Sequence, residues 1–449
     1  MKDISCNYCI SNYKYIFSIF FYFFHYHSMF LTDLINKERM RQEHSLELIA
    51  SENYVSQKVM LAYSNVFTNK YSEWYPGKRY YGGNEIVDQL ETYAQWLALK
   101  IFWLDAQWWW VNVQPLSWSV ANCAVYTGLL NPGDTILAMD LNAWWHLTHG
   151  MKLNASGKYF NIIHYGVDEK WIINYDQLLQ LALTHKPKLI VAWFSSYPRS
   201  INRKKFLECK RELSKEWNHC YLMADIAHIA GLIAWWTLLS PFDEGFDIIT
   251  TTTHKTLRWP RWALIYYSLS QGKELEQAIN RWVFPWIQGW PFDHVLVAKA
   301  QAFLEILDPQ NNRSLYCQKV LLNAKVLSNE LISLGRTLTT WWTDNHLMVV
   351  DVTHNNWEPT WLSGKSAEQL LESIWLSINK QLLPHDPRTP QDPSWIRIGT
   401  PAITTRGLNE DDVKSIAHII HECLLNLRDK HILHENILKL CNQYPLRYS

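Results

Sequence analysis

Two charged side chains follow apolar or β-branched runs of the sequence and could do chemistry together. Asp225 ends the run CYLMAD, and Lys255 follows four threonines in TTTTHK. A lysine at the end of a buried strand needs a partner for its charge or a pKa lowered by desolvation. A lowered pKa suits a lysine that forms a Schiff base, and a neighbouring aspartate could hold a protonated pyridine nitrogen. Singly each residue is more often structural, but together they indicate a pyridoxal phosphate site.

A phosphate site would make that interpretation more specific. Ser117 and Ser119 stand on either side of Trp118, just before the helical stretch from Val120 to Leu130. Hydroxyls and free backbone N–H groups at a helix N-terminus bind anions. The alternative is an ordinary N-cap serine, which stabilises a helix by about 1 kcal/mol. The combination of strand-end aspartate, strand-end lysine and helix-terminus serines favours the phosphate interpretation.

Three further features could bind substrate or move protons. The segment SEWYPGKRYYGG holds one acid, Glu73, among tyrosines, a setting for general acid–base work. Arg397 in WIRIGTPA could clamp a carboxylate with two hydrogen bonds, or form an ordinary salt bridge. His146 and His149 have HxxH spacing without the acid of a zinc motif, so we interpret His146 as a stacking group and expect no metal.

These residues need a parallel sheet to bring them together. Short buried runs alternate with longer stretches that can hold helices, as in βαβ units. In such sheets the ligand lies at the carboxyl ends of the strands. The expected fold class is therefore α/β with a mainly parallel central sheet, and its strands are Thr135–Met139, Lys188–Ser195, Cys220–Asp225 and Asp247–Thr252.

Length and composition set the outer limits. The chain has 449 residues, 48% hydrophobic and 19% charged, which excludes a disordered protein. The 42 basic residues balance the 42 acidic ones, so nothing indicates binding to nucleic acid or a membrane. Eight cysteines are too few for a disulfide scaffold and suit a reducing compartment, the cytoplasm.

The chain divides into four parts by character. Residues 1–28 form an aromatic prefix, with a lone CxxC at Cys6 and Cys9, and we expect translation to start at Met29. An N-terminal arm at 29–59 and a large cofactor-binding domain at 60–305 should follow. After residue 305 the sequence turns to charged helical stretches around a strand at His346–Val352, which predicts a small α+β domain at 306–449.

From about Met29 to Arg428 the sequence resembles the serine hydroxymethyltransferases. The matching segments are LIASEN (48–53), NKYSEWYPGKRYYGGNE (69–85), NVQPLSWSVAN (112–122), HLTHG (146–150), MADIAH (223–228), TTTTHKTLR (250–258), FPWIQGWP (284–291), TDNHL (343–347) and IRIGTPAITTRG (396–407). The resemblance implies a fold-type I pyridoxal phosphate enzyme. Such an enzyme interconverts serine and glycine, passes the one-carbon unit to tetrahydrofolate, and works as a homodimer with shared active sites.

The resemblance also implies a role for each matching residue. Lys255 would carry pyridoxal phosphate as a Schiff base and Asp225 would pair with its ring nitrogen. The other implied cofactor contacts are His146, Ser195, His228, His254, Ser117, Ser119 and, from the second subunit, Tyr71 and Gly289. The implied substrate contacts are Ser51 and Arg397 for the amino acid, Glu73 with Tyr81 beside it for proton transfer, and Leu141 and Leu147 for the folate. Gln381 departs from the family, which has asparagine there at a folate contact.

The larger departure is tryptophan. The chain has 16 glycines, where average usage gives about 31, and 25 tryptophans. Tryptophan replaces family glycines at 74, 110, 118, 144, 145, 193, 217, 235 or 236, 259, 262, 286, 290, 341, 342 and 395, including Trp118 between the two serines. Trp96, Trp357 and Trp361 fall where the family varies. Glycine is used where φ is positive or a ligand approaches closely. We hypothesise that UGA encodes glycine in this gene and has been translated as tryptophan.

Two alternatives stay open at this stage. A threonine aldolase shares the cofactor chemistry but not the folate, and a test of tetrahydrofolate dependence would separate it. If the tryptophans are real, the chain could be a cofactor-free pseudoenzyme with an aromatic binding surface. The absorbance of a Schiff base that disappears in Lys255→Ala would exclude the pseudoenzyme.

Overall fold

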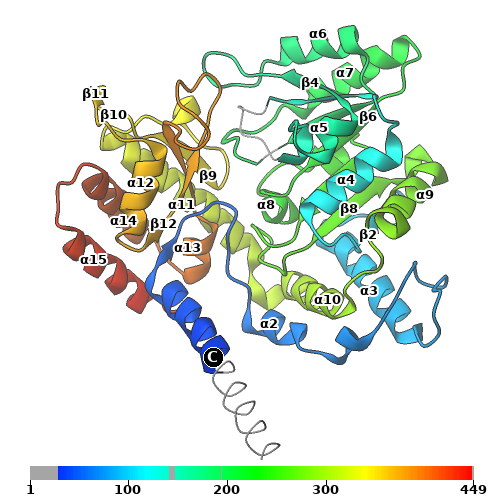
Figure 1. Ribbon diagram of the computed structural model, residues 1–449, viewed down its shortest axis with the longest axis horizontal. Coiled ribbons are helices and arrows are strands. Elements are labelled where there is room, and N and C mark those ends of the chain that lie inside the picture. Colours follow the sequence, from blue (N-terminus) through cyan, green and yellow to red (C-terminus); the bar gives the residue numbers. More distant parts are fainter. Residues whose placement is uncertain (1–28, 141–146, 194, 447–449) are drawn as a thin grey trace, which may run out of the picture.

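In the computed structural model, which describes residues 29–140, 147–193 and 195–446, a seven-stranded sheet forms the centre of the larger half of the molecule (Figure 1). Its strands from edge to edge are β2 (Trp109–Asn112), β8 (Ala263–Ser268), β7 (Ile248–Thr252), β6 (Tyr221–Asp225), β5 (Leu189–Trp193), β3 (Thr135–Met139) and β4 (Asn161–Tyr165). The ladders from β4 to β7 are parallel, and β8 runs antiparallel to both its neighbours. The expected mainly parallel sheet is confirmed.

The four strand predictions succeed because buried parallel strands need continuous apolar or β-branched runs. Every residue of β7 is buried, including its three threonines. A buried hydroxyl needs a partner, and Thr252 finds one by donating to the carbonyl oxygen of Ala227 at 3.2 Å. Thr251 donates likewise to Thr252 O at 2.9 Å, so two of the three buried hydroxyls of this central strand are paired within the protein.

Helices cover this sheet. In Figure 1, α6 and α7 lie side by side, and α4 and α9 lie together elsewhere on the sheet. The helices of this half are α2 (Gln57–Tyr63), α3 (Glu85–Ile101), α4 (Trp118–Leu129), α5 (Ala155–Tyr159), α6 (Tyr175–His185), α7 (Arg203–Lys215), α8 (Ala230–Ala234), α9 (Lys273–Arg281) and α10 (Asp293–Leu307). Short helical turns are η1 (Val66–Asn69), η2 (Leu147–His149), η3 (Pro241–Asp243), η4 (Leu269–Gln271), η5 (Trp282–Ile287) and η6 (Pro309–Asn311).

The smaller half is built on an antiparallel sheet with its own hydrophobic core. Its central strands are β13 (Asn379–Gln381), β14 (Trp395–Gly399) and β9 (Leu347–Asp351), beside the short pair β10 (His354–Asn355) and β11 (Glu358–Pro359). The turn η7 (Thr339–Trp341) precedes β9, and the helices of this half are α11 (Arg313–Ser333), α12 (Gly364–Glu372), α13 (Pro401–Arg406), α14 (Glu410–Leu424) and α15 (Lys430–Gln443).

Two elements join the halves. Helix α11 places Cys317 and Val320 in the larger core and Leu327 and Leu331 in the smaller one. Strand β1 (Leu46–Glu47) pairs in parallel with β12 (Leu376–Ser377), so the N-terminal segment crosses to the smaller half. The two cores agree with a large and a small domain, and the four boundaries stay a prediction.

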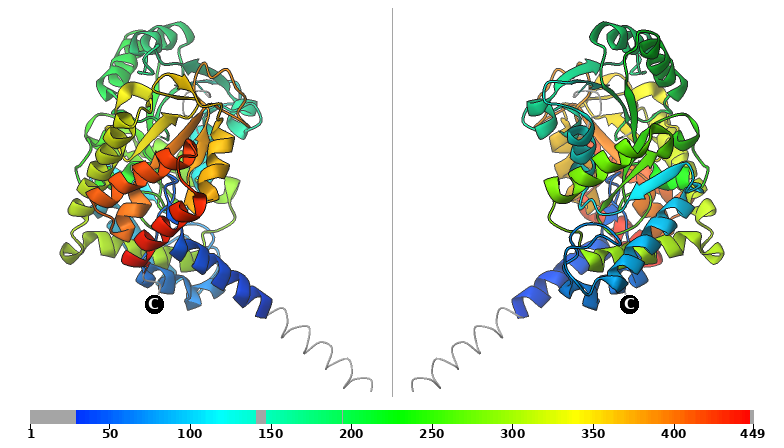
Figure 2. Two further views of the ribbon diagram at one scale, coloured as in Figure 1. Left: turned by 90° about the vertical axis from the view of Figure 1, so that its left-hand side faces the viewer. Right: turned by 90° about the vertical axis from the view of Figure 1, so that its right-hand side faces the viewer.

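Residues 29–44 form a helix that projects from the body of the molecule (Figure 2). Its apolar side chains are exposed, for example Leu31 at 60% and Ile35 at 56%. In the described part of the chain, no helix combines the length and the apolar character needed to cross a membrane.

Candidate cofactor site

Asp225 and Lys255 both lie at the carboxyl edge of the large sheet, after neighbouring strands. Asp225 is the last residue of β6 and pairs in register with Thr250 of β7. Lys255 follows the end of β7 by three residues, so it lies in the turn after the strand rather than at the strand end. Because β6 and β7 are parallel, both side chains reach the same edge, where ligands bind in open α/β sheets.

Asp225 is fully buried and its carboxylate accepts from several donors. Trp118 Nε1 donates to Oδ2 at 2.5 Å, Asn122 Nδ2 donates to it at 3.0 Å, and His149 Nε2 lies 3.1 Å away. Burial works to raise the pKa of Asp225, but the His149 hydrogen bond and charge, with the amide of Asn122, hold that pKa below its usual range. The carboxylate is therefore kept ionised deep inside the protein.

The residues that support Asp225 were not predicted from the sequence. The hydroxyl of Tyr126 lies 2.5 Å from Nδ1 of His149, whose other ring nitrogen faces Asp225, so the three side chains form one buried line. Trp118, Asn122 and Tyr126 recur every four residues on α4, the spacing of one helix face. That spacing was readable from the sequence, and so was His149 within HLTHG.

Lys255, unlike Asp225, is buried without hydrogen bonds to the end of its side chain: among the described residues, its Nζ has no hydrogen-bond partner. Burial lowers the pKa of Lys255 well below its ordinary value, and Arg397 and Arg261 add to the effect against the attraction of Asp225. Burial also lowers the pKa of the neighbouring His254, to about 3, so that ring is neutral at physiological pH. A buried amine with a lowered pKa suits attack on an aldehyde.

The indole of Trp118 fills the space between these two groups. Lys255 Nζ lies 3.5 Å from the centre of the indole, and the indole nitrogen donates to Asp225. An unpartnered amine facing a carboxylate across an aromatic ring is the donor set that pyridoxal phosphate needs. The residues fit the chemistry of that group, but with tryptophan at 118 the site does not admit its ring.

The predicted phosphate serines lie at the expected helix N-terminus. Ser117 is the N-cap of α4 and accepts from Val120 N at 3.3 Å, and both Ser117 and Ser119 are exposed. The indole of Trp118, which the sequence suggested would separate the two serines at the phosphate, instead turns inward to Asp225. It therefore blocks the ring position and leaves both hydroxyls accessible.

Arg397 on β14 brings the smaller half to the site. Its Nη1 donates to Ser196 Oγ at 2.7 Å and lies 3.4 Å from the carbonyl oxygen of Ser195, and its Nε donates to Asn379 Oδ1 at 3.0 Å. Burial lowers the pKa of Arg397 to about 10, so it stays positively charged. No acidic partner appears in these contacts, which leaves a cation suited to a substrate carboxylate.

Two more predicted residues lie near this arginine and lysine. The ring of His228 stacks on His346 with 5.6 Å between centres and lies 6.2 Å from the Trp118 ring. Ser51 follows Ala50, and Ala50 lies so close to Gly399 of β14 that a Cβ there would be 2.5 Å from the Ala50 Cα. Five predicted residues are thus brought together: Lys255, Asp225, Ser195, His228 and Arg397. Ser51 is placed only through Ala50, which lies against Gly399.

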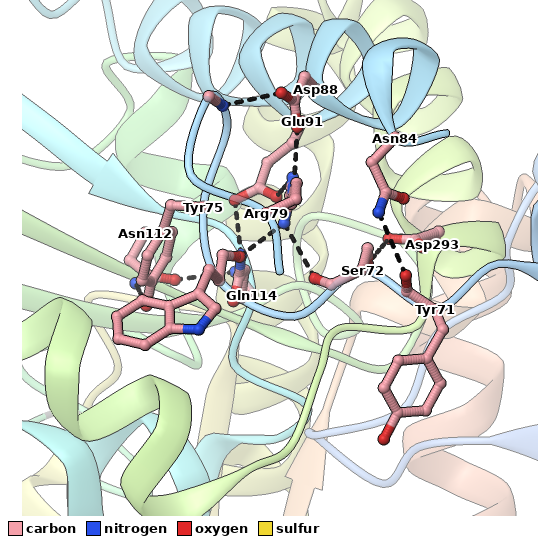
Figure 3. Close-up of polar contacts among 12 residues, drawn as sticks. Tyr71, Ser72, Tyr75, Arg79, Asn84, Asp88, Glu91, Asn112, Gln114 and Asp293 are labelled. Atoms are coloured by element: carbon pink, nitrogen blue, oxygen red, sulfur yellow. Dashed lines mark hydrogen bonds and ion pairs between the residues drawn. The ribbon is translucent and has the colours of Figure 1, made fainter. Parts of the chain in front are cut away.

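The tyrosine-rich loop at 71–83 is held by a buried ion network (Figure 3). Arg79 Nε donates to Asp88 at 2.7 Å and its Nη2 donates to Glu91 at 2.6 Å, both on α3. Glu91 also accepts from Gln114 Nε2 at 2.8 Å. Burial raises the pKa of Glu91 although Arg79 opposes the shift. The network fixes the loop against the body of the large domain.

The remaining predicted residues form a second group around this loop. The ring of Tyr71 lies 5.5 Å from Tyr81 and 4.2 Å from Trp290, which follows Gly289. Partial desolvation and the neighbouring Glu73 carboxylate raise the pKa of Tyr71. Among the described residues, none of these ring contacts reaches Lys255 or Asp225.

The other residues predicted from the sequence lie outside the described part of the chain or away from Lys255 and Asp225. His146 and Leu141 fall outside the described residues, as do Trp144, Trp145, Cys6 and Cys9. Leu147 is 55% exposed in η2. Gln381, the departure from the family, donates to the carbonyl oxygen of Leu382 at 2.9 Å. The described residues contain no group of three or more potential metal ligands.

The fold and the paired strand-end residues define a class, the fold-type I pyridoxal phosphate-dependent transferases. The family model of serine hydroxymethyltransferase matches residues 26–420. Curated serine hydroxymethyltransferases of Prochlorococcus marinus are similar: that of strain MIT 9515 is 46% identical over 93% of this chain and 95% of its own length, and that of strain NATL2A is 46% identical over 93% and 97%. The chain belongs to the serine hydroxymethyltransferase family.

Proposed function

We propose that this chain, with a small residue at 118, catalyses the reversible conversion of serine and tetrahydrofolate into glycine and 5,10-methylenetetrahydrofolate. The family uses pyridoxal phosphate and tetrahydrofolate, and its substrates are small molecules. One observation carries the proposal for this chain: a buried, unpartnered amine at Lys255 faces a fully hydrogen-bonded carboxylate at Asp225 across an aromatic ring.

In this proposal Lys255 would hold the cofactor through its amine, and Asp225 would hold the proton on the ring nitrogen, so that the ring could draw electrons from the substrate. The low pKa of Lys255 supports the first role, and the ionised state of Asp225 supports the second. Ser117 and Ser119 would hold the phosphate at the N-terminus of α4. Arg397, with Ser51 near it, would bind the carboxylate of the amino acid.

We further propose that the second group serves the neighbouring subunit of a homodimer. Tyr71, Tyr81, Gly289 and Glu73 are grouped at an exposed loop that the Arg79 network holds in place. Glu73 would then move the proton as the carbon–carbon bond of serine breaks. The exposed apolar side chains on the helix at 29–44 support pairing, because such side chains grouped on a surface normally contact a partner.

The free cysteine thiols support a proposal about where in the cell the enzyme works. The structure describes six cysteines, all as free thiols and five of them buried. Thiols persist in reducing compartments. We therefore propose that the enzyme works in the cytoplasm.

The test is a serine-cleavage assay on the chain carrying glycine at 118. We expect glycine to form from serine, with at least about a tenfold dependence on added tetrahydrofolate, a discrimination of about 1.4 kcal/mol. Lys255→Ala should abolish the reaction. A chain that cleaves β-hydroxy amino acids equally well without the folate would be an aldolase, and a chain that never binds pyridoxal phosphate would be a pseudoenzyme.

A further inference from the structure

In the described part of the chain, six helices end with the same pair of hydrogen bonds. One residue just after the helix, the exit residue, donates its N–H to the carbonyl oxygen three residues before it. The next residue donates to the carbonyl oxygen one position earlier, and the two bonds together define a Schellman motif. The exit residue must be left-handed, with positive φ, so glycine is usual there and asparagine is an occasional substitute. The helices concerned are α3, α7, α8, α11, α13 and α14.

Three of the six ends follow the rule. After α11, Gly335 has φ 88° and donates to Ile332 O at 2.9 Å, and Arg336 donates to Leu331 O at 3.0 Å. The exit residue of α13 is Gly407, with φ 106°, and that of α14 is Asn426, with φ 54°. These three ends show what the same backbone normally requires.

The other three ends carry tryptophan. Trp103, Trp217 and Trp236 have φ of 59°, 60° and 52°. After α7, Trp217 donates to Ser214 O at 3.1 Å and Asn218 donates to Leu213 O at 3.2 Å, the same two bonds as after α11. A bulky residue with positive φ is a genuine outlier, and three helix ends of one protein share it.

Burial does not explain these tryptophans. Trp217 is 97% exposed, Trp236 is 67% exposed and Trp103 is 57% exposed. The rings of Trp103 and Trp236 stack on each other at 5.0 Å on the surface, while that of Trp217 stands in solvent. An indole so placed stabilises no core, so nothing offsets the strain of its backbone.

The same sign of φ recurs elsewhere. Nine of the 23 described tryptophans have positive φ, where only a few per cent of non-glycine residues do. The six beyond these helix ends are Trp74, Trp171, Trp341, Trp357, Trp361 and Trp375. Trp357 and Trp361 lie where the family varies, so only the backbone marks them. At the pair Trp235 and Trp236, only Trp236 is left-handed, which decides between the two.

We infer that glycine stands at 103, 217, 236 and 118 in the protein that the cell makes, because its UGA codons are decoded as glycine. The helix-end argument is independent of the proposed function, and the extension to 118 rests on that function. Glycine at 118 removes the indole between Lys255 and Asp225, and the same change that relaxes three helix ends opens the cofactor site.

Peptide mass analysis of the protein purified from its own cells tests this directly. We expect the peptides that cover 103, 217, 236 and 118 to have the mass of glycine at each position and the gene to read UGA there. Tryptophan, or any residue other than glycine, at any of the four positions overturns the inference. A glycine result would stand even if the purified protein lacked the proposed activity, so the two proposals fail separately.

A stability comparison within one helix tests the physical argument. Trp96 and Trp103 are both exposed, but Trp96 lies inside α3 and Trp103 lies after its end. In the recombinant chain, we expect W103G to raise the midpoint of thermal unfolding by about 1–2 °C, since it removes left-handed strain. W96G should lower that midpoint, because glycine is a poor residue inside a helix. An unchanged or lowered midpoint for W103G overturns the argument.

Discussion

Helices α7 and α11 end with the same two hydrogen bonds, but one exit residue is Trp217 and the other is Gly335. The backbone at the two ends is alike, with φ of 60° and 88°. Only the glycine meets the requirement without strain, because it has no Cβ. Where backbone and side chain disagree in this way, the backbone hydrogen bonds report the requirement of the fold and the side chain is the discordant part.

The two sides of the cofactor site differ in a similar way. Asp225 accepts from Asn122, His149 and the indole of Trp118, while Lys255 has no hydrogen-bond partner among the described residues. The described residues of this chain supply all the hydrogen bonds that Asp225 Oδ2 accepts, whereas the amine of Lys255 lacks a partner that a bound aldehyde would supply. The carboxylate is therefore already paired in the cofactor-free protein, and the amine is not.

The largest effect is expected when the glycine after α11 is replaced by tryptophan, so that α11 ends as α7 does. A Cβ at Gly335 would lie 2.3 Å from Asn356 Oδ1, and its φ of 88° would strain any side chain. We expect G335W to lower the free energy of unfolding by about 2–5 kcal/mol, as overpacking adds to left-handed strain. Urea unfolding measures the effect. A variant as stable as its parent would mean that tryptophan is harmless at such helix ends.

The contrast between the two sides of the cofactor site can be tested by replacing Lys255. Its lowered folded pKa means that the unfolded chain binds more protons, so the stability of the Lys255 chain rises with pH up to about 10. We expect Lys255→Met to stabilise the cofactor-free chain by about 1–3 kcal/mol at neutral pH, because an unpartnered buried amine is lost. The gain should grow as the pH falls and fade toward pH about 10 in urea unfolding.

Lys299 supplies the matched control for that prediction. It is also buried with a lowered pKa, but its Nζ donates to Val113 O at 2.5 Å and lies 3.3 Å from Ala263 O. Lys299→Met should destabilise the chain, since two buried carbonyl oxygens each lose a donor, although Val113 O keeps that of Trp262 Nε1 at 3.1 Å. Equal gains at 255 and 299 would show that Lys255 is not distinguished by its missing partner.

The smallest expected effect concerns the Asp225 side. His149→Phe removes the ring that links Tyr126 to Asp225, and we expect it to lower the free energy of unfolding by about 1–2 kcal/mol. Tyr126→Phe, which leaves the Asp225 contact intact, should cost about 1 kcal/mol or less. If Tyr126→Phe costs more than His149→Phe in urea unfolding, His149 does not support the carboxylate.

The strands and the paired residues were predictable because they depend on local pattern. Buried β-branched runs gave β3, β5, β6 and β7 to within two residues, and parallel order then placed Asp225 beside Lys255. The support from His149 and Tyr126 was missed, although helix spacing on α4 carried part of the signal. The inward turn of Trp118 could not be predicted, because it depends on which space the folded core leaves open.

Glycine positions were predictable only where the family supplied them. Trp103 and Trp375 lie in left-handed backbone, but neither is marked by local composition. Their φ follows from how the chain leaves α3 and, before β12, how it approaches Leu46. Tertiary geometry therefore reveals glycine sites that a pattern of residue types does not.

The most direct measurement is borohydride reduction of the recombinant chain with pyridoxal phosphate, followed by peptide mass analysis. The central claim is that Lys255 and Asp225 face each other across the position of the cofactor ring and that Trp118 occupies it. With glycine at 118, we predict a reduced phosphopyridoxyl group on Lys255, and with tryptophan at 118 we predict none there. Labelling of Lys255 that is equal in both chains, or absent from both, would contradict the account.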